Sequence, residues 1–181
     1  MRPALFRLFA ATCFATLVAS ACATEQLSGT GLVATIDPPV PALGSAGPAL
    51  LRCEPVASPQ TVTGVIGVLG GTLRLGNTMV VIPENAVPGP TTFTLTVPQS
   101  PIVEISVRAG TAEHYVFRRP VSVTIDYSRC AASLDPARAV TAWHIDEGSK
   151  RLLENMGGLD LRAANRITFL TGHLSGYAVA D

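Results

Sequence analysis

Apolar and polar side chains alternate with a period of two through most of the chain after its first third. In residues 91–97, Phe93 and Leu95 fall on one side of the segment and threonines fall on the other. The same alternation recurs in residues 102–107 and 121–127. Because successive side chains of a strand point to opposite faces of a sheet, these segments are predicted to be half-buried β-strands.

Other short apolar runs are separated by glycine, proline and asparagine. Residues 70–82 contain a Gly-Asn turn between two such runs and predict a β-hairpin. The loop at residues 131–137 is predicted to hold at most one helical turn, capped by Ser133 or Asp135. The remaining predicted strands are 50–54, 61–67, 115–117, 139–145, 151–154, 159–161, 167–171 and 177–180. Such closely spaced strands without intervening helices predict an all-β fold, either a β-sandwich or a partly open barrel.

The first 21 residues have the pattern of an export signal. Arg2 and Arg7 precede an apolar stretch over residues 8–18, which is too short to span a bilayer as a stable helix. The segment ends in Ala-Ser-Ala followed by Cys22, which allows two interpretations. The small residues suit ordinary signal cleavage after Ala21, and Cys22 is also placed as the lipid anchor of a bacterial lipoprotein, although Leu is usual where Ala19 stands.

Residues 22–49 are rich in Pro, Gly and Ala and are predicted to be a flexible linker. The segment offers too little periodic apolar surface to fold alone. Residues 50–181 are then expected to form one β-sandwich domain, a normal size for a domain with its own core. The chain is expected to be exported, with a periplasmic, outer-membrane-associated or extracellular location.

The charge distribution gives no electrostatic basis for binding nucleic acid. The chain has 13 basic and 13 acidic residues, and removal of the predicted signal leaves 11 basic and 13 acidic ones. Only one lysine, Lys150, is present, and the longest basic block is Arg118-Arg119. A polybasic membrane patch is therefore not expected, and the membrane would be reached only through a lipid on Cys22.

Two of the four cysteines are placed to form a disulfide bond. Cys13 lies in the predicted signal and Cys22 at its end, which leaves Cys53 and Cys130 in the domain. In an oxidising compartment these two are predicted to be bonded. The alternative is a pair of buried free thiols.

The polar residues with catalytic or metal-binding capacity form no recognisable motif. His114, His144 and His173 lie far apart without zinc-type spacing, so three separate histidines are expected, with no metal and no cofactor. Paired acids of a glycosidase type and a Gly-x-Ser-x-Gly elbow are both missing from the sequence. A hydrolytic enzyme is therefore unsupported.

Four segments together resemble a bacterial ZU5-like domain over residues 61–181. They are Gly70-Gly71-Thr72-Leu73, Val81-Ile82-Pro83-Glu84-Asn85-Ala86-Val87, Tyr115-Val116-Phe117 before Pro120-Val121, and His173-Leu174-Ser175-Gly176-Tyr177-Ala178-Val179. Val87 and Leu174 depart from the family pattern, in which Leu and Phe are usual. The resemblance implies an antiparallel β-sandwich that serves as an interaction module.

Some eukaryotic members of that family break their own backbone at a His-Phe-Ser segment, which is similar to residues 173–175. By this resemblance, Ser175 would attack the carbonyl carbon of Leu174 and His173 would accept the proton. The alternative is that these are ordinary polar residues before the last strand. The leading hypothesis is a non-catalytic module that binds an unknown protein or envelope component. The others are self-cleavage and carbohydrate binding through Trp143 with Tyr115, Tyr127 and Tyr177, although these aromatic residues could equally belong to the core.

Overall fold

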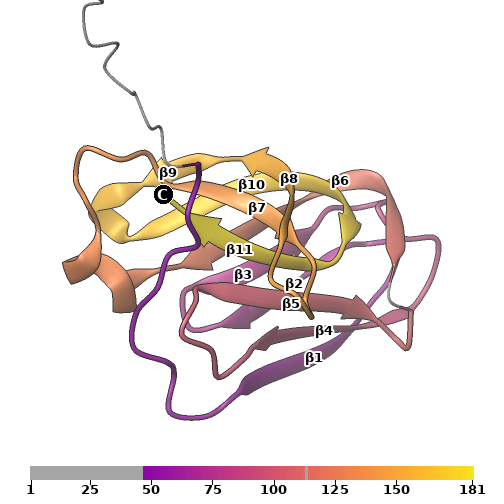
Figure 1. The fold of residues 1–181 in the computed structure, drawn as a ribbon. Coiled ribbons are helices and arrows are strands. Elements are labelled where there is room, and N and C mark those ends of the chain that lie inside the picture. Colours follow the sequence, from indigo (N-terminus) through magenta and orange to yellow (C-terminus); the bar gives the residue numbers. More distant parts are fainter. Residues whose placement is uncertain (1–46, 113) are drawn as a thin grey trace, which may run out of the picture. The chain divides into compact units, whose positions relative to one another are not determined.

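The computed structural model describes residues 47–112 and 114–181, and in them two antiparallel sheets pack into a β-sandwich (Figure 1). The predicted signal, Cys22 and the linker as far as residue 46 lie outside the described residues. One sheet has six strands in the order β1-β4-β5-β11-β7-β8, and the other has five in the order β2-β3-β6-β10-β9. The strands are β1 (Gln60–Ile66), β2 (Gly71–Leu75), β3 (Thr78–Ile82), β4 (Thr91–Val97), β5 (Glu104–Ala109), β6 (Tyr115–Asp126), β7 (Thr141–Ile145), β8 (Leu152–Gly157), β9 (Leu159–Leu161), β10 (Arg166–Leu174) and β11 (Gly176–Ala180).

The alternation read from the sequence corresponds to the buried and exposed sides of the strands. Phe93 and Leu95 of β4 are fully buried, as are Val121 and Val123 of β6. These inward-facing side chains from both sheets form one core. The predicted all-β fold is therefore confirmed, and its form is the sandwich.

The predicted hairpin at residues 70–82 is also confirmed. Leu75 pairs with Thr78 at the end of the β2–β3 ladder, which leaves Gly76-Asn77 as a two-residue turn. Gly70 has a φ of 74°, and a Cβ atom there would lie 2.4 Å from the carbonyl oxygen of Ile82. Only glycine fits this position, because the left-handed conformation and the close backbone approach both exclude a side chain.

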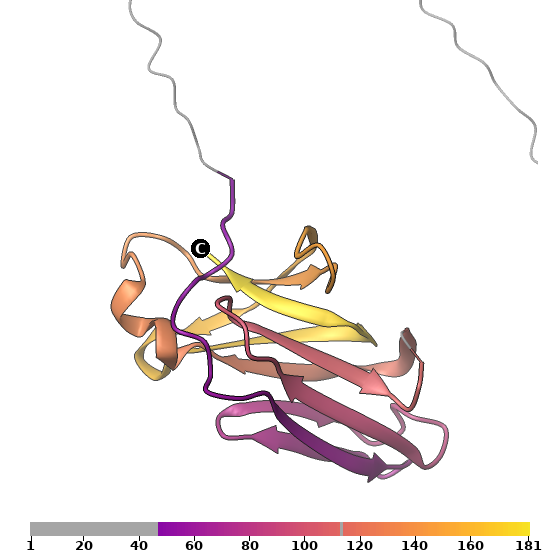
Figure 2. The ribbon, with the colours of Figure 1, turned by 60° about the horizontal axis from the view of Figure 1, so that its bottom comes forward.

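The strand predicted at residues 50–54 is wrong. Only isolated bridges form there, at Leu50 and Arg52. The segment crosses the ends of neighbouring strands, since the Leu51 amide donates to the Val179 carbonyl and the Val103 amide donates to the Leu51 carbonyl. Figure 2 shows it passing the C-terminus on the way to β1. Along this path Leu51 is buried, and the backbone hydrogen bonds form no continuous ladder.

The turn predicted between residues 117 and 121 is wrong as well, because β6 continues through Pro120. β6 pairs with β10, and the register shifts between Thr171 and His173, which pair with Val121 and Val116. The extra residues on β6 therefore bulge out of the ladder at the proline. A bulge tolerates proline because no ladder hydrogen bond is required from its missing N–H group.

The helical turn predicted in residues 131–137 lies earlier in the chain. The first 3-10 helix spans Ser128–Ser133, where the Asp126 carboxylate accepts a hydrogen bond of 2.8 Å from the Ser128 amide. Asp135 instead accepts a hydrogen bond from the Ala137 amide in the following loop. A second 3-10 helix, Arg162–Ala164, was not predicted. In the described part of the chain, no helix is long and apolar enough to cross a membrane.

The predicted disulfide bond between Cys53 and Cys130 is present, with a Cα–Cα distance of 5.2 Å. It joins the first described segment to the first 3-10 helix. The neighbouring Arg129 guanidinium donates hydrogen bonds to the carbonyl oxygens of Glu54, Ser100 and Ile102. The disulfide and Arg129 together fix the otherwise irregular segment before β1 to the body of the domain.

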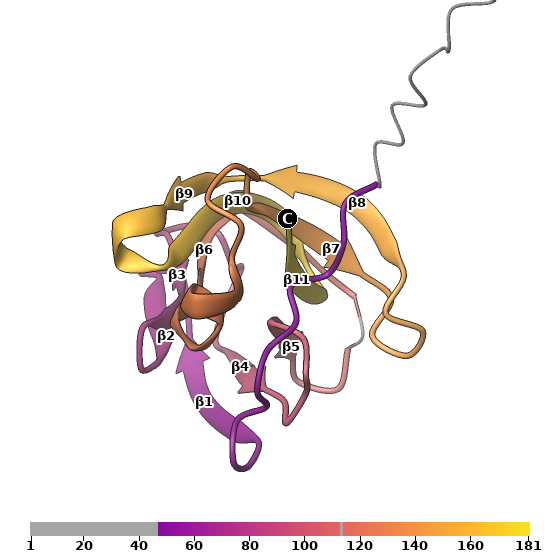
Figure 3. The same ribbon diagram turned by 60° about the vertical axis from the view of Figure 1, so that its left-hand side comes forward.

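The two sheets approach each other where β8 lies beside β10 (Figure 3). β10 belongs to the five-stranded sheet and β11 to the six-stranded sheet, and Ser175 is the one residue between them. The chain therefore changes sheets at Ser175. This corner holds the tripeptide that the sequence singled out.

Candidate functional site

Residues 173–175 form the corner between the two sheets. His173 and Leu174 end β10, where Leu174 pairs with Tyr115 of β6. Leu174 is 1% exposed and Ser175 is 9% exposed. The peptide bond between them is therefore largely removed from water.

Hydroxyl groups hold the backbone of this corner in place. The His173 carbonyl accepts hydrogen bonds from the Thr171 hydroxyl, at 3.0 Å, and from the Tyr177 hydroxyl. The His173 amide donates to the Thr171 oxygen at 3.3 Å, and the two hydroxyls lie 3.1 Å apart. Both polar groups of the His173 backbone are thus satisfied inside the domain, as buried backbone groups require.

The Tyr177 side chain is fully buried beside Phe169, with ring centroids 5.1 Å apart. Burial raises the pKa of Tyr177 to about 12, and the Glu154 carboxylate adds to the rise, whereas the hydrogen bond to Thr171 lowers it. The phenol is consequently neutral at physiological pH. It acts as a hydrogen-bond donor to the corner.

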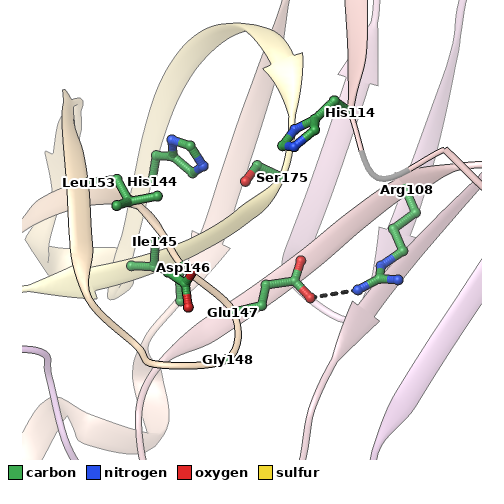
Figure 4. A pocket seen from close by; sticks show the side chains of 9 residues that line it. All are labelled: Arg108, His114, His144, Ile145, Asp146, Glu147, Gly148, Leu153 and Ser175. Atoms are coloured by element: carbon green, nitrogen blue, oxygen red, sulfur yellow. Dashed lines mark hydrogen bonds and ion pairs between the residues drawn. The ribbon is translucent and has the colours of Figure 1, made fainter.

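A cavity of about 360 Å³ opens next to the corner (Figure 4). Figure 4 shows the Ser175 hydroxyl between the imidazoles of His144 and His114. On the other side, the Glu147 carboxylate accepts hydrogen bonds from Arg108, at 2.8 Å, and from the Ser106 hydroxyl, at 2.9 Å. The cavity is lined by Arg108, His114, His144, Ile145, Asp146, Glu147, Gly148, Leu153 and Ser175.

His173 is directed to a different group of side chains. Its Nε2 atom lies 3.6 Å from the Glu154 carboxylate, and its ring centroid lies 5.1 Å from that of His144. In residues 47–112 and 114–181, no hydrogen bond links His173 to Ser175. The histidine that precedes the serine in sequence is therefore not the one that shares its cavity. Its role as the proton acceptor stays a prediction.

The expectation of three separate histidines is wrong for His144 and His173. His144 lies opposite both Tyr177 of β11 and Glu154 of β8 in the six-stranded sheet, and β10 brings His173 against it. Three potential ligand atoms, one each from His144, Glu154 and His173, all lie within 4.8 Å of one another.

Burial lowers the pKa of His144, and the nearby His173 and His114 lower it further, while Glu154 opposes this effect. His144 is therefore kept neutral near pH 7. Sequence reasoning did not identify Glu154 or His144 as site residues. The available signal was the alternation of the strand, which puts His144 on the same strand face as Ala142, a residue that the structure shows to be fully buried.

Trp143 does not form the aromatic platform that a carbohydrate-binding module uses. Its side chain is half-buried on the opposite face of β7, and its Nε1 atom donates a hydrogen bond of 2.9 Å to Thr141. Among the aromatic contacts of the described residues, none involves Trp143. The hypothesis of carbohydrate binding gains no support from this arrangement.

Comparison with known proteins adds no family assignment. No protein-family model matches the chain, and no curated protein is significantly similar to it. The resemblance to ZU5-like domains therefore stays a prediction.

Proposed function

We propose that this chain is an exported, non-enzymatic β-sandwich that binds a protein partner of the cell envelope, with Cys22 as a candidate lipid anchor. The Cys53–Cys130 disulfide supports an oxidising compartment. The observation that carries the proposal is the solvent-facing surface of the five-stranded sheet.

Cross-strand pairing places twelve side chains of that sheet on one face. Val81 pairs with Ser122, which pairs with Leu170, and Thr124 pairs with Thr168, which pairs with Leu159. Residues directly opposite each other in a ladder point to the same side of the sheet. We call this surface the outer face; it consists of Thr72, Arg74, Met79, Val81, Ser122, Thr124, Asp126, Leu159, Leu161, Arg166, Thr168 and Leu170.

Several large apolar side chains of the outer face are exposed to solvent. Leu159 is 66% exposed, Leu170 is 65% exposed and Leu161 is 44% exposed. Its polar residues are mostly hydroxyls, such as Thr124 and Thr168, whose Oγ1 atoms lie 2.9 Å apart. Several exposed leucines on one sheet face are typical of the buried part of a protein interface.

A photo-reactive amino acid at position 170 would test this proposal in cells that produce the protein. We expect a discrete cross-linked adduct from position 170 and none from position 92, because Thr92 is exposed on the other sheet. Val81→Lys should abolish the adduct, since it places a charge on the outer face near Leu170, from which only Ser122 separates it across the sheet. Equal adducts from positions 170 and 92, or none from either, would contradict the proposal.

The second candidate is self-cleavage between Leu174 and Ser175, favoured by the position of the Ser175 hydroxyl between two imidazoles in one cavity. Attack on the Leu174 carbonyl carbon would pass the hydroxyl proton through a histidine to the Ser175 nitrogen. The resulting ester would be hydrolysed by water to a Leu174 carboxylate and a free Ser175 hydroxyl.

The backbone conformation favours the non-enzymatic proposal over self-cleavage. This reaction needs a strained peptide, and the positive φ angles of non-glycine residues in the described part of the chain occur at Asn85, Lys150 and Asn165, away from the corner. Mass spectrometry of the denatured protein should show the intact chain, identical in processing to a Ser175→Ala variant. Loss of the fragment 175–181 from the wild type alone would instead establish self-cleavage, and His144→Gln and His173→Gln would then identify the base.

A further inference from the structure

We propose that His144, Glu154 and His173 form a binding site for a zinc-like divalent cation, which ties β8 to β10 across the two sheets. This inference is independent of the proposed interaction function. Two imidazoles and one carboxylate are a ligand set that holds Zn²⁺ in proteins, with water in the remaining position.

The distances within the cluster suit one shared ion. A tetrahedral ion with bonds of about 2.1 Å keeps its ligand atoms about 3.4 Å apart. The His173 Nε2 and Glu154 Oε2 atoms are already 3.6 Å apart, and the widest separation among the three ligand atoms is at most 4.8 Å. The Glu154 side chain is 60% exposed and can rotate to close this gap, whereas the half-buried histidines need little movement.

Strand pairing and the side chains of Thr171 and Tyr177 hold the two histidines in position. His144 and Glu154 face each other across the β7–β8 ladder. The His173 backbone is held by the hydroxyls of Thr171 and Tyr177, and the Tyr177 ring packs 6.1 Å from the His144 ring and 6.2 Å from the His173 ring. Ligands that are positioned before the ion arrives bind it more tightly, because less order is lost on binding.

The position of the cluster gives the ion a structural role. β8 is the last strand of the six-stranded sheet, so one of its edges has no neighbouring strand within residues 47–112 and 114–181. An ion bound by Glu154 of β8 and His173 of β10 would join this edge to the other sheet beside the corner at Ser175. Such a link protects an edge strand from opening and from pairing with another chain.

Isothermal titration with Zn²⁺ tests the site, with the protein purified without a polyhistidine tag. We expect saturation at one equivalent, with affinity reduced at least about tenfold in His144→Gln, His173→Gln and Glu154→Gln. Glu154→Gln is the decisive variant, because it is isosteric and exposed and so leaves the fold intact. His114→Gln is the matched control and should leave the affinity unchanged.

Cobalt provides a second readout, because Co²⁺ bound at a four-coordinate site gives strong visible absorption that Zn²⁺ should displace. Amide hydrogen exchange in β8 should slow when Zn²⁺ is added to the wild type and not when it is added to Glu154→Gln. The proposal is overturned if no saturable binding is found, if Glu154→Gln keeps wild-type affinity, or if His114→Gln weakens binding as much as the other variants do. In these cases the cluster is an ordinary histidine–glutamate ion pair.

Discussion

The Tyr177 hydroxyl donates a hydrogen bond to the main-chain carbonyl of His173, across the corner at which the chain changes sheets. Thr171 bonds to both groups, so a residue on each side of Ser175 is held by the same network. The network explains how a single residue can connect strands of two different sheets. It also places the His173 imidazole against His144 and Glu154.

Tyr177→Phe should lower the free energy of unfolding by about 1 to 2 kcal/mol. The substitution keeps the buried ring but removes the phenol and leaves the Thr171 hydroxyl and the His173 carbonyl with fewer partners. Urea unfolding followed by tryptophan fluorescence measures the change. Tyr115→Phe is the matched control, because no hydrogen bond of the Tyr115 hydroxyl occurs within the described residues, and it should unfold like the wild type.

The same tyrosine predicts a loss of stability in alkaline solution. Because folding raises the pKa of Tyr177 from 10.0 to about 12, its contribution is fully present below pH 10 and is lost as the pH rises to 12. The expected loss is about 2 to 3 kcal/mol. The free energy of unfolding, measured at pH 9 and at pH 11.5, should fall less for Tyr177→Phe than for the wild type. An equal pH dependence of stability in both proteins would show that folding does not raise the pKa of Tyr177.

Reduction of the Cys53–Cys130 bond should destabilise the domain markedly. The bond spans a sequence separation of 77 residues, for which the chain-entropy model gives up to about 4 to 5 kcal/mol. Thermal unfolding with and without reductant measures the effect. A Cys53→Ser/Cys130→Ser variant should melt near the reduced wild type and should not respond to reductant, whereas a response would indicate that the reductant acts elsewhere.

Lys150→Met should cost about 2 to 3 kcal/mol of stability. The Lys150 ammonium lies 2.6 Å from the Glu104 carboxylate, whose side chain is only 4% exposed, so the substitution leaves a buried charge without its partner. Arg138→Met is the control, because Arg138 pairs with Asp181 at 3.7 Å on a more exposed surface and should cost less than about 1 kcal/mol. Similar costs for the two variants would contradict a special role for the buried pair.

Sequence patterns predicted the strands best where both faces of a segment are clearly marked. Residues 91–97 match β4 because Phe93 and Leu95 point to the core while threonines face outward. Residues 50–54 contain apolar residues, but the segment forms only isolated bridges and no continuous ladder. It packs against the ends of neighbouring strands instead. Pro120 appeared to end a strand because local rules do not include the bulge that forms in β6 where it pairs with β10.

The candidate metal cluster was less predictable than the strands. Each of its residues is on a strand that the alternation identified in part, but their chain positions show no ligand spacing. Register brings Glu154 opposite His144, and the pairing of β10 with β6 on the far side of the β6 bulge places His173 beside them. Register depends on how whole strands pair, so spacing along the chain gives no direct indication of it.

The sequence by itself determined the all-β class, the hairpin at Gly76 and the pairing of Cys53 with Cys130, because alternation, turn residues and a single remaining cysteine pair are local or countable properties. The tertiary structure decided which sheet each strand joins, that the chain changes sheets at Ser175, and that His173 faces Glu154 rather than the serine. These features depend on strand order and register, which arise from packing two sheets around a common core.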